Sequence, residues 1–381
     1  MRKAPCFLLI FCLIFTLLPS PAAAAQLDVA GKSALLMDAA TGRVLYEKNA
    51  HEKLSPASVT KVMTLLLIME AIDSGKIGWD DTVTASDAAA AKGGSQIFLK
   101  VGETMTVTDL VKSIAVSSAN DAACAMAEHL AGSETAFVSQ MNDRAAQLGM
   151  ADTHFVNCTG LDDSADAATH LTSAHDIAIM SRELMANHPD ITKFTTIWMD
   201  TVRNGTFGLA NTNKLIRFYP GAIGVKTGYT SKAGFCLSAC AQRDGLMLIA
   251  VVLGADSSQD RFAACKGLLD YGFANFALAE YSPEDLSVPV KLGQQNTVSA
   301  IPGGDTRLLI DKSQRNDIHY QVELEEWVSA PVSQGQKIGT LSIRAGDQIL
   351  AQIPMVAEQA VLRKTWGQIF LQFLRAITMG K

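Results

Sequence analysis

The segment that most constrains this chain is residues 55–64, SPASVTKVMT, which run directly into the apolar residues 65–69. Proline is favoured at the first position of a helix, so the segment predicts a helix with Ser55 as its N-cap. Ser58 and Lys61 are three residues apart, which places them on one face of such a helix. The apolar turns that follow predict burial, and burial lowers the pKa of a lysine until its amine can take the proton of a nearby hydroxyl. Ser58 is therefore a candidate nucleophile, and Lys61 is its candidate base.

Alone, the spacing of Ser58 and Lys61 could belong to a capped core helix with a solvated lysine. Two further short motifs favour the catalytic interpretation. Residues 118–120 read SAN, residues 226–230 read KTGYT, and each motif occurs once. The first could simply cap the helix that begins near Asp121. The second is not a phosphate-binding loop, because Val225 stands where that motif requires glycine. On the edge of a strand it would instead present backbone donors, hydroxyls and one cation, which suit a carboxylate and an adjacent amide.

The N-terminal residues have the order of a secretory signal peptide. Arg2 and Lys3 precede an apolar run at residues 7–18, and the small residues 22–25 follow it. This order predicts a signal peptide over residues 1–25 that is cleaved at its end, with an uncleaved anchor as the alternative. We therefore expect an exported protein.

Charge and cysteine content narrow the classes of function. The formal net charge is −6 and the pI is about 5.7, which argues against a nucleic-acid partner. The five cysteines beyond residue 25 are odd in number and lack C-x-x-C spacing, so we expect buried free thiols rather than a disulfide framework or a zinc site. They are Cys124, Cys158, Cys236, Cys240 and Cys265. The sequence has no H-E-x-x-H motif, and we expect no metal and no cofactor.

Hydrophobic patterns after the signal peptide predict one large α+β unit over residues 26–280. The expected strands are a hairpin at 34–38 and 43–47, then 225–230, 234–242 and 246–254, the last two joined by the turn Asp244-Gly245. The expected helices are 108–114, 122–130, 134–148, one that begins after the cap Ser173, and 261–276. This order favours an antiparallel sheet with helices on it and an inserted helical subdomain.

A small all-β unit is expected over residues 281–357, because short alternating stretches are separated there by glycine, proline and aspartate. The expected strands are 286–292, 306–310, 319–324, 337–343 and 348–353. No catalytic cluster is visible in this unit.

Residues 358–381 have the pattern of an amphipathic helix. Its apolar face is expected to comprise Leu362, Trp366, Ile369, Phe370, Phe373 and Ile377. An apolar, aromatic face opposite a polar and basic one predicts a helix that lies in the membrane interface and anchors the protein peripherally. The alternatives are packing on the protein's own surface or in a dimer contact. Charged and amide residues interrupt the segment too often for a spanning helix.

In this order, S-x-x-K, S-x-N and K-T-G form the signature of class A β-lactamases and penicillin-binding proteins. The chain resembles a low-molecular-mass penicillin-binding protein, a serine-type D-alanyl-D-alanine carboxypeptidase of bacterial cell-wall metabolism. The resemblance covers nearly the whole length and includes residues 93–95 (GGS), 211–215 (NTNKL) and 268–273 (LLDYGF). It implies a penicillin-binding, β-lactamase-like transpeptidase domain, followed by the small all-β domain and the terminal helix. It also implies that the exported protein lies on the outer face of the cytoplasmic membrane, on its cell-wall or periplasmic side. Ala119 departs from the S-D-N of class A β-lactamases, which weakens that alternative.

The resemblance also implies a role for each matching residue. Ser58 attacks the carbonyl between the last two D-alanines of a peptidoglycan stem peptide, and neutral Lys61 takes its proton. Ser118 passes the proton to the leaving amine, and Asn120 fixes Lys61 and the substrate amide. The backbone N–H groups of Ser58 and Tyr229 form the oxyanion hole. The terminal carboxylate of the substrate is held by charged Lys226, which is also a catalytic residue, together with Thr227, Thr230 and Arg261. Gly228 and Tyr229 belong to the same substrate-binding segment.

Penicillin mimics the dipeptide but leaves no free amine to depart. The resemblance therefore implies that β-lactam antibiotics acylate Ser58 and persist as covalent inhibitors. The alternatives for the function are a β-lactamase, which deacylates fast, a D,D-endopeptidase that cuts cross-links, and a non-catalytic penicillin-binding sensor.

Overall fold

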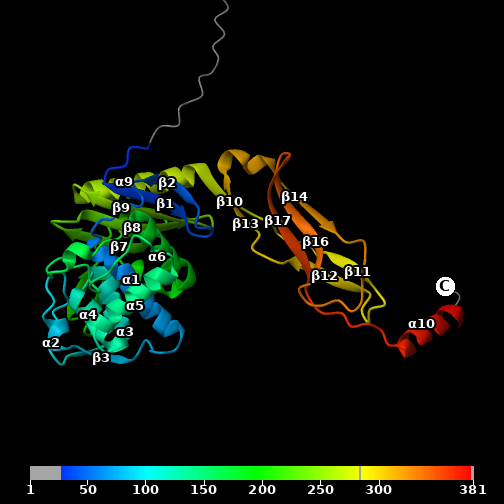
Figure 1. Ribbon diagram of the computed structural model, residues 1–381, viewed down its shortest axis with the longest axis horizontal. Coiled ribbons are helices and arrows are strands. Elements are labelled where there is room, and N and C mark those ends of the chain that lie inside the picture. The colour runs from blue at the N-terminus through cyan, green and yellow to red at the C-terminus, as the bar shows by residue number, and fades with distance from the viewer. Residues whose placement is uncertain (1–26, 283–284, 379–381) are drawn as a thin grey trace, which may run out of the picture.

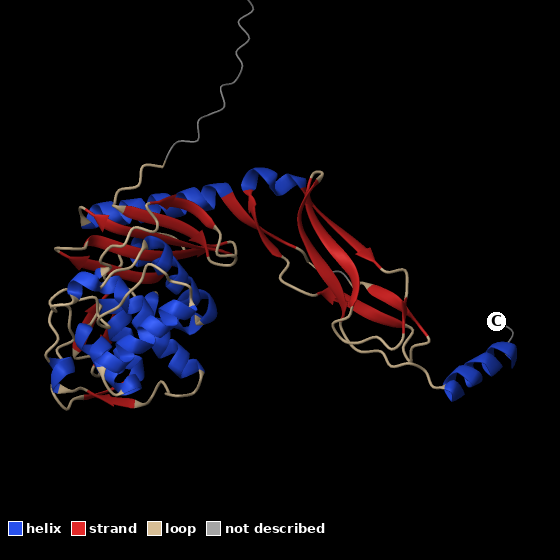
Figure 2. Cartoon of the chain, in the orientation of Figure 1, coloured by secondary structure: helices blue, strands red, loops and turns tan. Residues whose placement is uncertain are grey.

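The computed structural model describes residues 27–282 and 285–378, which form two domains followed by a separate helix (Figure 1). The first domain combines a sheet with most of the helices, and the second consists mainly of strands (Figure 2). The predicted signal peptide at residues 1–25 lies outside the described residues. Within the described ranges, no helix is both long and apolar enough to cross a membrane.

A five-stranded antiparallel sheet of order β2-β1-β9-β8-β7 forms the centre of the first domain. Its strands are β1 (Ser33–Asp38), β2 (Val44–Lys48), β7 (Ala222–Thr230), β8 (Gly234–Arg243) and β9 (Leu246–Ala255). Asp244 and Gly245 have φ angles of 49° and 79°, which fit the two-residue hairpin turn expected between β8 and β9. The N-terminal hairpin and the later strands thus form one sheet, as the sequence predicts.

Both faces of this sheet are covered, and the sequence of β9 fits that position. Leu248 and Ala250 belong to one hydrophobic core, whereas Ile249 and Val251 belong to the other, because successive side chains of a strand point to opposite faces. Helix α9 (Ser258–Asn275) lies over the first face, where Leu215 of the short helix α8 (Leu215–Phe218) joins the same core, and most of the other helices of the domain lie against the second face (Figure 1). Burial on both faces explains why β9 is an almost continuous apolar run.

The other helices of the first domain lie between β2 and β7 in sequence. They are α1 (Lys61–Asp73), α2 (Asp87–Ala90), α3 (Val107–Ser117), α4 (Asn120–Ala131), α5 (Glu134–Gln147), α6 (Ala174–Asn187), α7 (Thr192–Thr195) and α8 (Leu215–Phe218). Ser173 caps α6 as predicted, since its side chain accepts a hydrogen bond of 3.1 Å from the N–H of Asp176. Two short antiparallel strand pairs were not predicted: β3 (Thr82–Thr84) with β4 (Thr104–Thr106), which α2 separates in sequence, and β5 (Met199–Val202) with β6 (Phe207–Ala210). Strands this short show too little alternation to be recognised.

The segment that carries Ser58 begins differently from the prediction. Residues Ala57–Thr60 form a 3₁₀ turn, η1, and the α-helix starts only at Lys61. Pro56 is the N-cap of this turn and no side chain caps it, so the prediction of Ser55 as N-cap is wrong. Ala57 has a φ angle of 48°, which lies outside the helical region. A 3₁₀ turn still places Ser58 and Lys61 on one side, because residues i and i+3 eclipse each other in it.

The second domain is built on a six-stranded sheet of order β14-β16-β17-β12-β11-β15. Its strands are β11 (Ser287–Lys291), β12 (Thr297–Pro302), β14 (Ile318–Leu324), β15 (Val328–Ser329), β16 (Lys337–Ala345) and β17 (Gln348–Ala357). A separate antiparallel pair, β10 (Phe276–Glu280) with β13 (Arg307–Asp311), joins the end of the first domain to the second. Each of the five predicted strands overlaps an observed one, whereas β10, β12 and β15 were not predicted.

The terminal helix, α10, spans Trp366–Thr378 and does not begin at residue 358 as predicted. Val361 is buried in the core of the β domain, and its backbone exchanges two hydrogen bonds of 2.9 Å with Val332. These contacts hold the segment before α10 in an extended conformation. Leu362 therefore lies outside the helix, and the other five residues of the predicted apolar face lie on it.

Candidate active site

Ser58 and Lys61 lie together at the start of α1. The Nζ of Lys61 donates a hydrogen bond of 3.0 Å to the Oγ of Ser58 and another of 2.8 Å to the backbone oxygen of Thr159. Lys61 is completely buried. Burial lowers the pKa of Lys61 from 10.5 to about 7, and Cys158 and Asp121 oppose this shift more weakly. A large share of the amine is therefore neutral near neutral pH, and the neutral amine is the form that accepts a proton from serine.

Thr159 belongs to a turn at residues 157–160 to which the sequence analysis assigned no role. The side-chain oxygen of Asn157 accepts hydrogen bonds from the N–H groups of Thr159 (3.1 Å) and Gly160 (2.7 Å), which closes the turn. Gly160 has a φ angle of 81°, and a Cβ there would lie 1.8 Å from the backbone oxygen of Ala57. Glycine is therefore required where this turn packs against the Ser58 segment. The only sequence signal was the stretch Asn157-Cys158-Thr159-Gly160, a turn pattern without catalytic meaning of its own.

Ser118 and Asn120 lie at the junction of α3 and α4. Ser118 ends α3 in a left-handed conformation (φ 65°) and Ala119 is the N-cap of α4, so Ser118 does not cap that helix. Such a conformation is unfavourable for serine, and residues of this kind concentrate at functional sites. Asn120 donates from its backbone N–H to Ser95 and from its side chain to the backbone oxygen of Gly93, both at 2.7 Å. Its Oδ1 is buried and has no hydrogen-bond partner among the described residues.

The K-T-G motif lies on β7, the edge strand of the sheet, directly beside the Ser58 turn. A Cβ at Gly228 would lie 2.6 Å from the backbone oxygen of Pro56 and 3.1 Å from the backbone nitrogen of Ser58. Both neighbours are backbone atoms, which have little room to move aside. The glycine of the motif is therefore what allows β7 to approach the nucleophile so closely.

Thr227 connects β7 to the end of α3. Its Oγ1 donates a hydrogen bond of 2.6 Å to the Oγ1 of Thr212, and the N–H of Thr212 donates one of 3.2 Å to the backbone oxygen of Val116. Val116 lies two residues before Ser118. The three sequence motifs, which are far apart in the chain, therefore border one region of the first domain.

Lys226 is buried in the same region as Lys61. Its Nζ donates a hydrogen bond of 3.0 Å to the backbone oxygen of Thr227. Burial, together with the nearby charges of Lys61 and Arg261, lowers the pKa of Lys226 well below its ordinary value. This direction opposes the expectation that Lys226 stays charged. A carboxylate bound beside Lys226 would favour its ammonium form again.

Tyr229 and Thr230 follow at the exposed end of β7. The Tyr229 side chain is 56% exposed, and its ring packs on that of Phe235 with the centroids 4.3 Å apart. The Thr230 hydroxyl accepts a hydrogen bond of 3.1 Å from the N–H of Ala233. These contacts fix the end of the strand.

Arg261 is buried near the start of α9 and holds β7 in place. Its Nη1 donates to the backbone oxygens of Gly228 (2.8 Å) and Cys236 (3.2 Å), and its Nη2 donates to Ser258 (3.4 Å). The guanidinium is thus directed at the backbones of β7 and β8. Its predicted contact with a substrate carboxylate stays a prediction.

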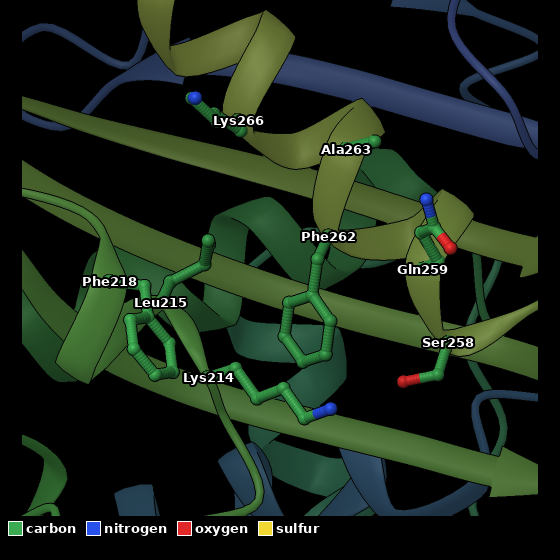
Figure 3. A pocket seen from close by; sticks show the side chains of 8 residues that line it. All are labelled: Lys214, Leu215, Phe218, Ser258, Gln259, Phe262, Ala263 and Lys266. Atoms are coloured by element: carbon green, nitrogen blue, oxygen red, sulfur yellow. The ribbon is translucent and has the colours of Figure 1, made fainter.

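Two hollows lie near these residues. One of about 610 Å³ opens between α8 and the start of α9, where Lys214, Ser258 and Phe262 point toward one another (Figure 3). None of the predicted catalytic side chains lines it. The other, of about 490 Å³, is lined by Gly93 and Thr159 among others, whose backbone oxygens hold Asn120 and Lys61. The second hollow therefore borders the catalytic residues.

Within the described residues, one cluster has metal-ligand spacing: Glu70, Glu183 and His188, whose ligand atoms lie within 4.8 Å of one another. Arg144 donates to both carboxylates, at 2.7 Å to Glu70 and 2.8 Å to Glu183. The guanidinium therefore already supplies positive charge to this cluster. All five cysteines beyond residue 25 are free and buried, as predicted.

Comparison with known proteins identifies the family. A family model described as D-alanyl-D-alanine carboxypeptidase matches residues 20–257, more than half of the chain. A second, described as penicillin-binding protein 5, C-terminal domain, matches residues 280–363. The D-alanyl-D-alanine carboxypeptidase DacF of Bacillus subtilis (strain 168) is 42% identical over 393 residues, which covers 100% of this chain and 98% of the relative.

Solved structures agree with this assignment. Penicillin-binding protein 5 from Haemophilus influenzae matches with a TM-score of 0.73 at 30% identity, over 88% of this chain and 98% of that one. Penicillin-binding protein D2 from Listeria monocytogenes, solved in its ampicillin-bound form, matches with a TM-score of 0.57 at 31% identity, over 65% of this chain and 99% of that one. The fold class, the family and the enzyme class predicted from the sequence are thereby confirmed. The chain belongs to the peptidase S11 family, the D-alanyl-D-alanine carboxypeptidases.

Proposed function

We propose that this enzyme removes the terminal D-alanine from peptidoglycan stem peptides through an acyl-enzyme on Ser58. The observation that carries the proposal is the pair of Ser58 and buried Lys61, with 3.0 Å between Oγ and Nζ. Neutral Lys61 takes the hydroxyl proton as Oγ attacks the carbonyl between the last two D-alanines. A pKa of about 7 suits a base that works near neutral pH.

In this mechanism, Ser118 passes the proton from Lys61 to the amine of the leaving D-alanine. Its position at the end of α3, joined to β7 through Thr212, supports the role. The buried Oδ1 of Asn120, which no described residue engages, is suited to accept the N–H of the substrate amide. Water then hydrolyses the ester at Ser58 and restores the enzyme.

The N–H groups of Ser58 and Tyr229 stabilise the oxyanion in this proposal. The close approach at Gly228 supports it, because the residue before Tyr229 packs its backbone against the nitrogen of Ser58. Preorganised backbone donors stabilise developing charge without having to reorient during the reaction. Removal of one such donor typically costs roughly 3 to 4 kcal/mol.

The substrate carboxylate binds to Lys226, Thr227 and Thr230, with Arg261 behind them. The burial of Lys226 and Arg261 supports this assignment, because a carboxylate offsets the cost of charging these side chains away from water. Arg261 also acts through the backbone of Gly228. Substrate binding then raises the pKa of Lys226, so it is coupled to proton uptake. β-Lactams occupy the same site and acylate Ser58.

Export and attachment to the outer face of the cytoplasmic membrane complete the proposal, with residues 26–280 as the catalytic unit, 281–357 as the β unit and the tail as the anchor. Trp366, Phe370, Phe373 and Ile377 are 87%, 61%, 62% and 62% exposed. Their spacing of four, three and four residues places them on one face of α10. Burial of one such side chain contributes roughly 1.5 to 3 kcal/mol, so four together support reversible binding to a membrane interface.

The test of the enzymatic proposal is release of D-alanine from a synthetic peptide that ends in D-Ala-D-Ala. Wild type should release D-alanine, Ser58→Ala should not, and Ser74→Ala, at the exposed end of α1, should match wild type. A β-lactamase would instead turn over a cephalosporin rapidly, and an endopeptidase would cut a cross-linked dimer. A sensor would bind penicillin without releasing D-alanine, and that result from wild type would refute the proposal.

A further inference from the structure

A chain of hydrogen bonds runs behind Ser58 through residues that the mechanism does not use. The N–H of Val156 donates to the Nδ1 of His170 at 3.0 Å. The Nε2 of His170 lies 2.7 Å from the Oγ1 of Thr60, and that hydroxyl donates a bond of 2.8 Å to the backbone oxygen of Ala57. Thr60 is 0% and His170 is 2% exposed, so water does not compete for these bonds.

Only one arrangement of protons satisfies this chain. A backbone N–H can only donate, so the Nδ1 of His170 must carry a lone pair, and the ring proton sits on Nε2. Nε2–H then donates to the Thr60 hydroxyl, whose own proton goes to Ala57. Burial lowers the pKa of His170 to about 4, which agrees with a neutral ring. Every bond therefore points toward Ala57.

The group at the end of this chain is the peptide between Ala57 and Ser58. A peptide group is planar, and its C=O and N–H point in opposite directions, so fixing the oxygen of Ala57 also fixes the N–H of Ser58. Ala57 needs such support, because its φ angle of 48° is unfavourable for a residue with a Cβ. Gly160 also packs against the oxygen of Ala57 and limits the movement of that oxygen.

We propose that Thr60 and His170 are positioning residues that orient the N–H of Ser58 toward the oxyanion. The inference rests on the proposed function, because it assigns that N–H to the oxyanion hole. Neither side chain touches the substrate. Both act through the Ala57 carbonyl, so their loss should slow the acylation step and leave the preceding binding of a β-lactam unchanged.

The experiment measures acylation by a fluorescent penicillin in stopped flow, which separates the dissociation constant of the first complex from the acylation rate constant. Thr60→Val removes the hydroxyl and keeps the shape, and Thr60→Ser keeps the hydroxyl. Thr60→Val should lower the rate constant roughly tenfold to a hundredfold with an unchanged dissociation constant, because small displacements of a catalytic group have effects of this size. Thr60→Ser should restore most of the rate.

A double variant tests whether Thr60 and His170 act through the same connection to Ala57. The double variant Thr60→Val with His170→Leu should lose no more acylation rate than Thr60→Val alone, since both interrupt the same connection to Ala57. If the losses in acylation rate from the two substitutions add, His170 acts by another route and its proposed role is wrong.

If Thr60→Val does not fold, the acylation rates of His170→Gln and His170→Leu test the same hydrogen bond, because glutamine can donate to Thr60 and leucine cannot. Equal rates for these two would overturn the proposal.

The matched control is Thr153→Val, which removes the hydroxyl of a half-buried threonine that bonds to Thr172 (2.7 Å) and Asp176 (2.8 Å) and not to Ala57. It should lower the melting temperature and leave the acylation rate constant unchanged. If Thr60→Val acylates as fast as wild type, the inference is wrong while the proposed function stands. If wild type itself is not acylated at Ser58, the proposed function has failed first.

Discussion

Replacement of Lys61 by methionine should make the protein more stable while it abolishes activity. Lys61 is completely buried, and burial brings its pKa from 10.5 to about 7. In the unfolded chain the same side chain keeps its ordinary pKa and stays charged well above neutral pH. The folded protein therefore carries a cost for holding this amine out of water, and that cost disappears with the amine.

Linkage gives the size and the pH dependence of this cost. Between pH 7 and 10.5, the unfolded state binds more protons at this group than the folded state, so stability rises with pH in that window. For these two pKa values, the cost is about 4 kcal/mol at pH 7 and about 2 kcal/mol at pH 9. Lys61→Met also removes the hydrogen bonds to Ser58 and Thr159, at about 1 kcal/mol each. The net gain should be about 2 kcal/mol at pH 7 and close to zero at pH 9.

The assay is urea unfolding of the first domain, followed at pH 7 and at pH 9, for wild type and Lys61→Met. Lys266→Met, which removes an exposed lysine from α9, is the matched control and should change stability by less than about 0.5 kcal/mol at both pH values. A Lys61→Met variant that is less stable than wild type at pH 7 would refute the reasoning. A gain of equal size at the two pH values would also refute it, because the gain would not then come from the titration of Lys61.

Three further perturbations test other parts of the structure. Since Lys61 must be neutral to act as a base, the acylation rate should rise with pH through about 7 and then level off, and a flat profile from about pH 5 to about pH 9 would contradict its role. Gly228→Ala should slow acylation about a hundredfold, because the new Cβ would lie 2.6 Å from the backbone oxygen of Pro56. Gly267→Ala is the control and should leave the rate unchanged, because a Cβ there has no neighbour within 4 Å; similar acylation rates for the two variants would contradict the close approach of β7 to Ser58. Truncation after Thr365 should release the protein from anionic vesicles in a sedimentation assay and leave D-alanine release intact, and a truncated form that still sediments would exclude anchoring by α10.

The fold could be predicted where local patterns decide the structure. The apolar run of β9 and the turn Asp244-Gly245 carry their own signals, and the helix after Ser173 begins with its cap. The start of α10 could not be predicted, because the apolar pattern continues through Val361. The burial of that residue depends on Val332, which is distant in the sequence.

The same distinction holds for the active site. The sequence indicated Ser58 and Lys61 because a nucleophile and its base need those residue types at that spacing. The 3₁₀ turn before Lys61 could not be predicted, since it depends on Gly160, whose missing Cβ leaves room for the oxygen of Ala57. The partner of Lys61 at Thr159 was also missed, because a backbone oxygen leaves no mark on the residue type that carries it.

The most direct test of the central claim is to locate the site of acylation. The protein is incubated with penicillin, digested and analysed by mass spectrometry. One penicillin adduct should appear on the peptide that contains Ser58, and it should be absent from Ser58→Ala. An adduct on Ser118 or on any other residue, or no adduct on folded wild-type protein, would contradict the assignment of Ser58 as the nucleophile.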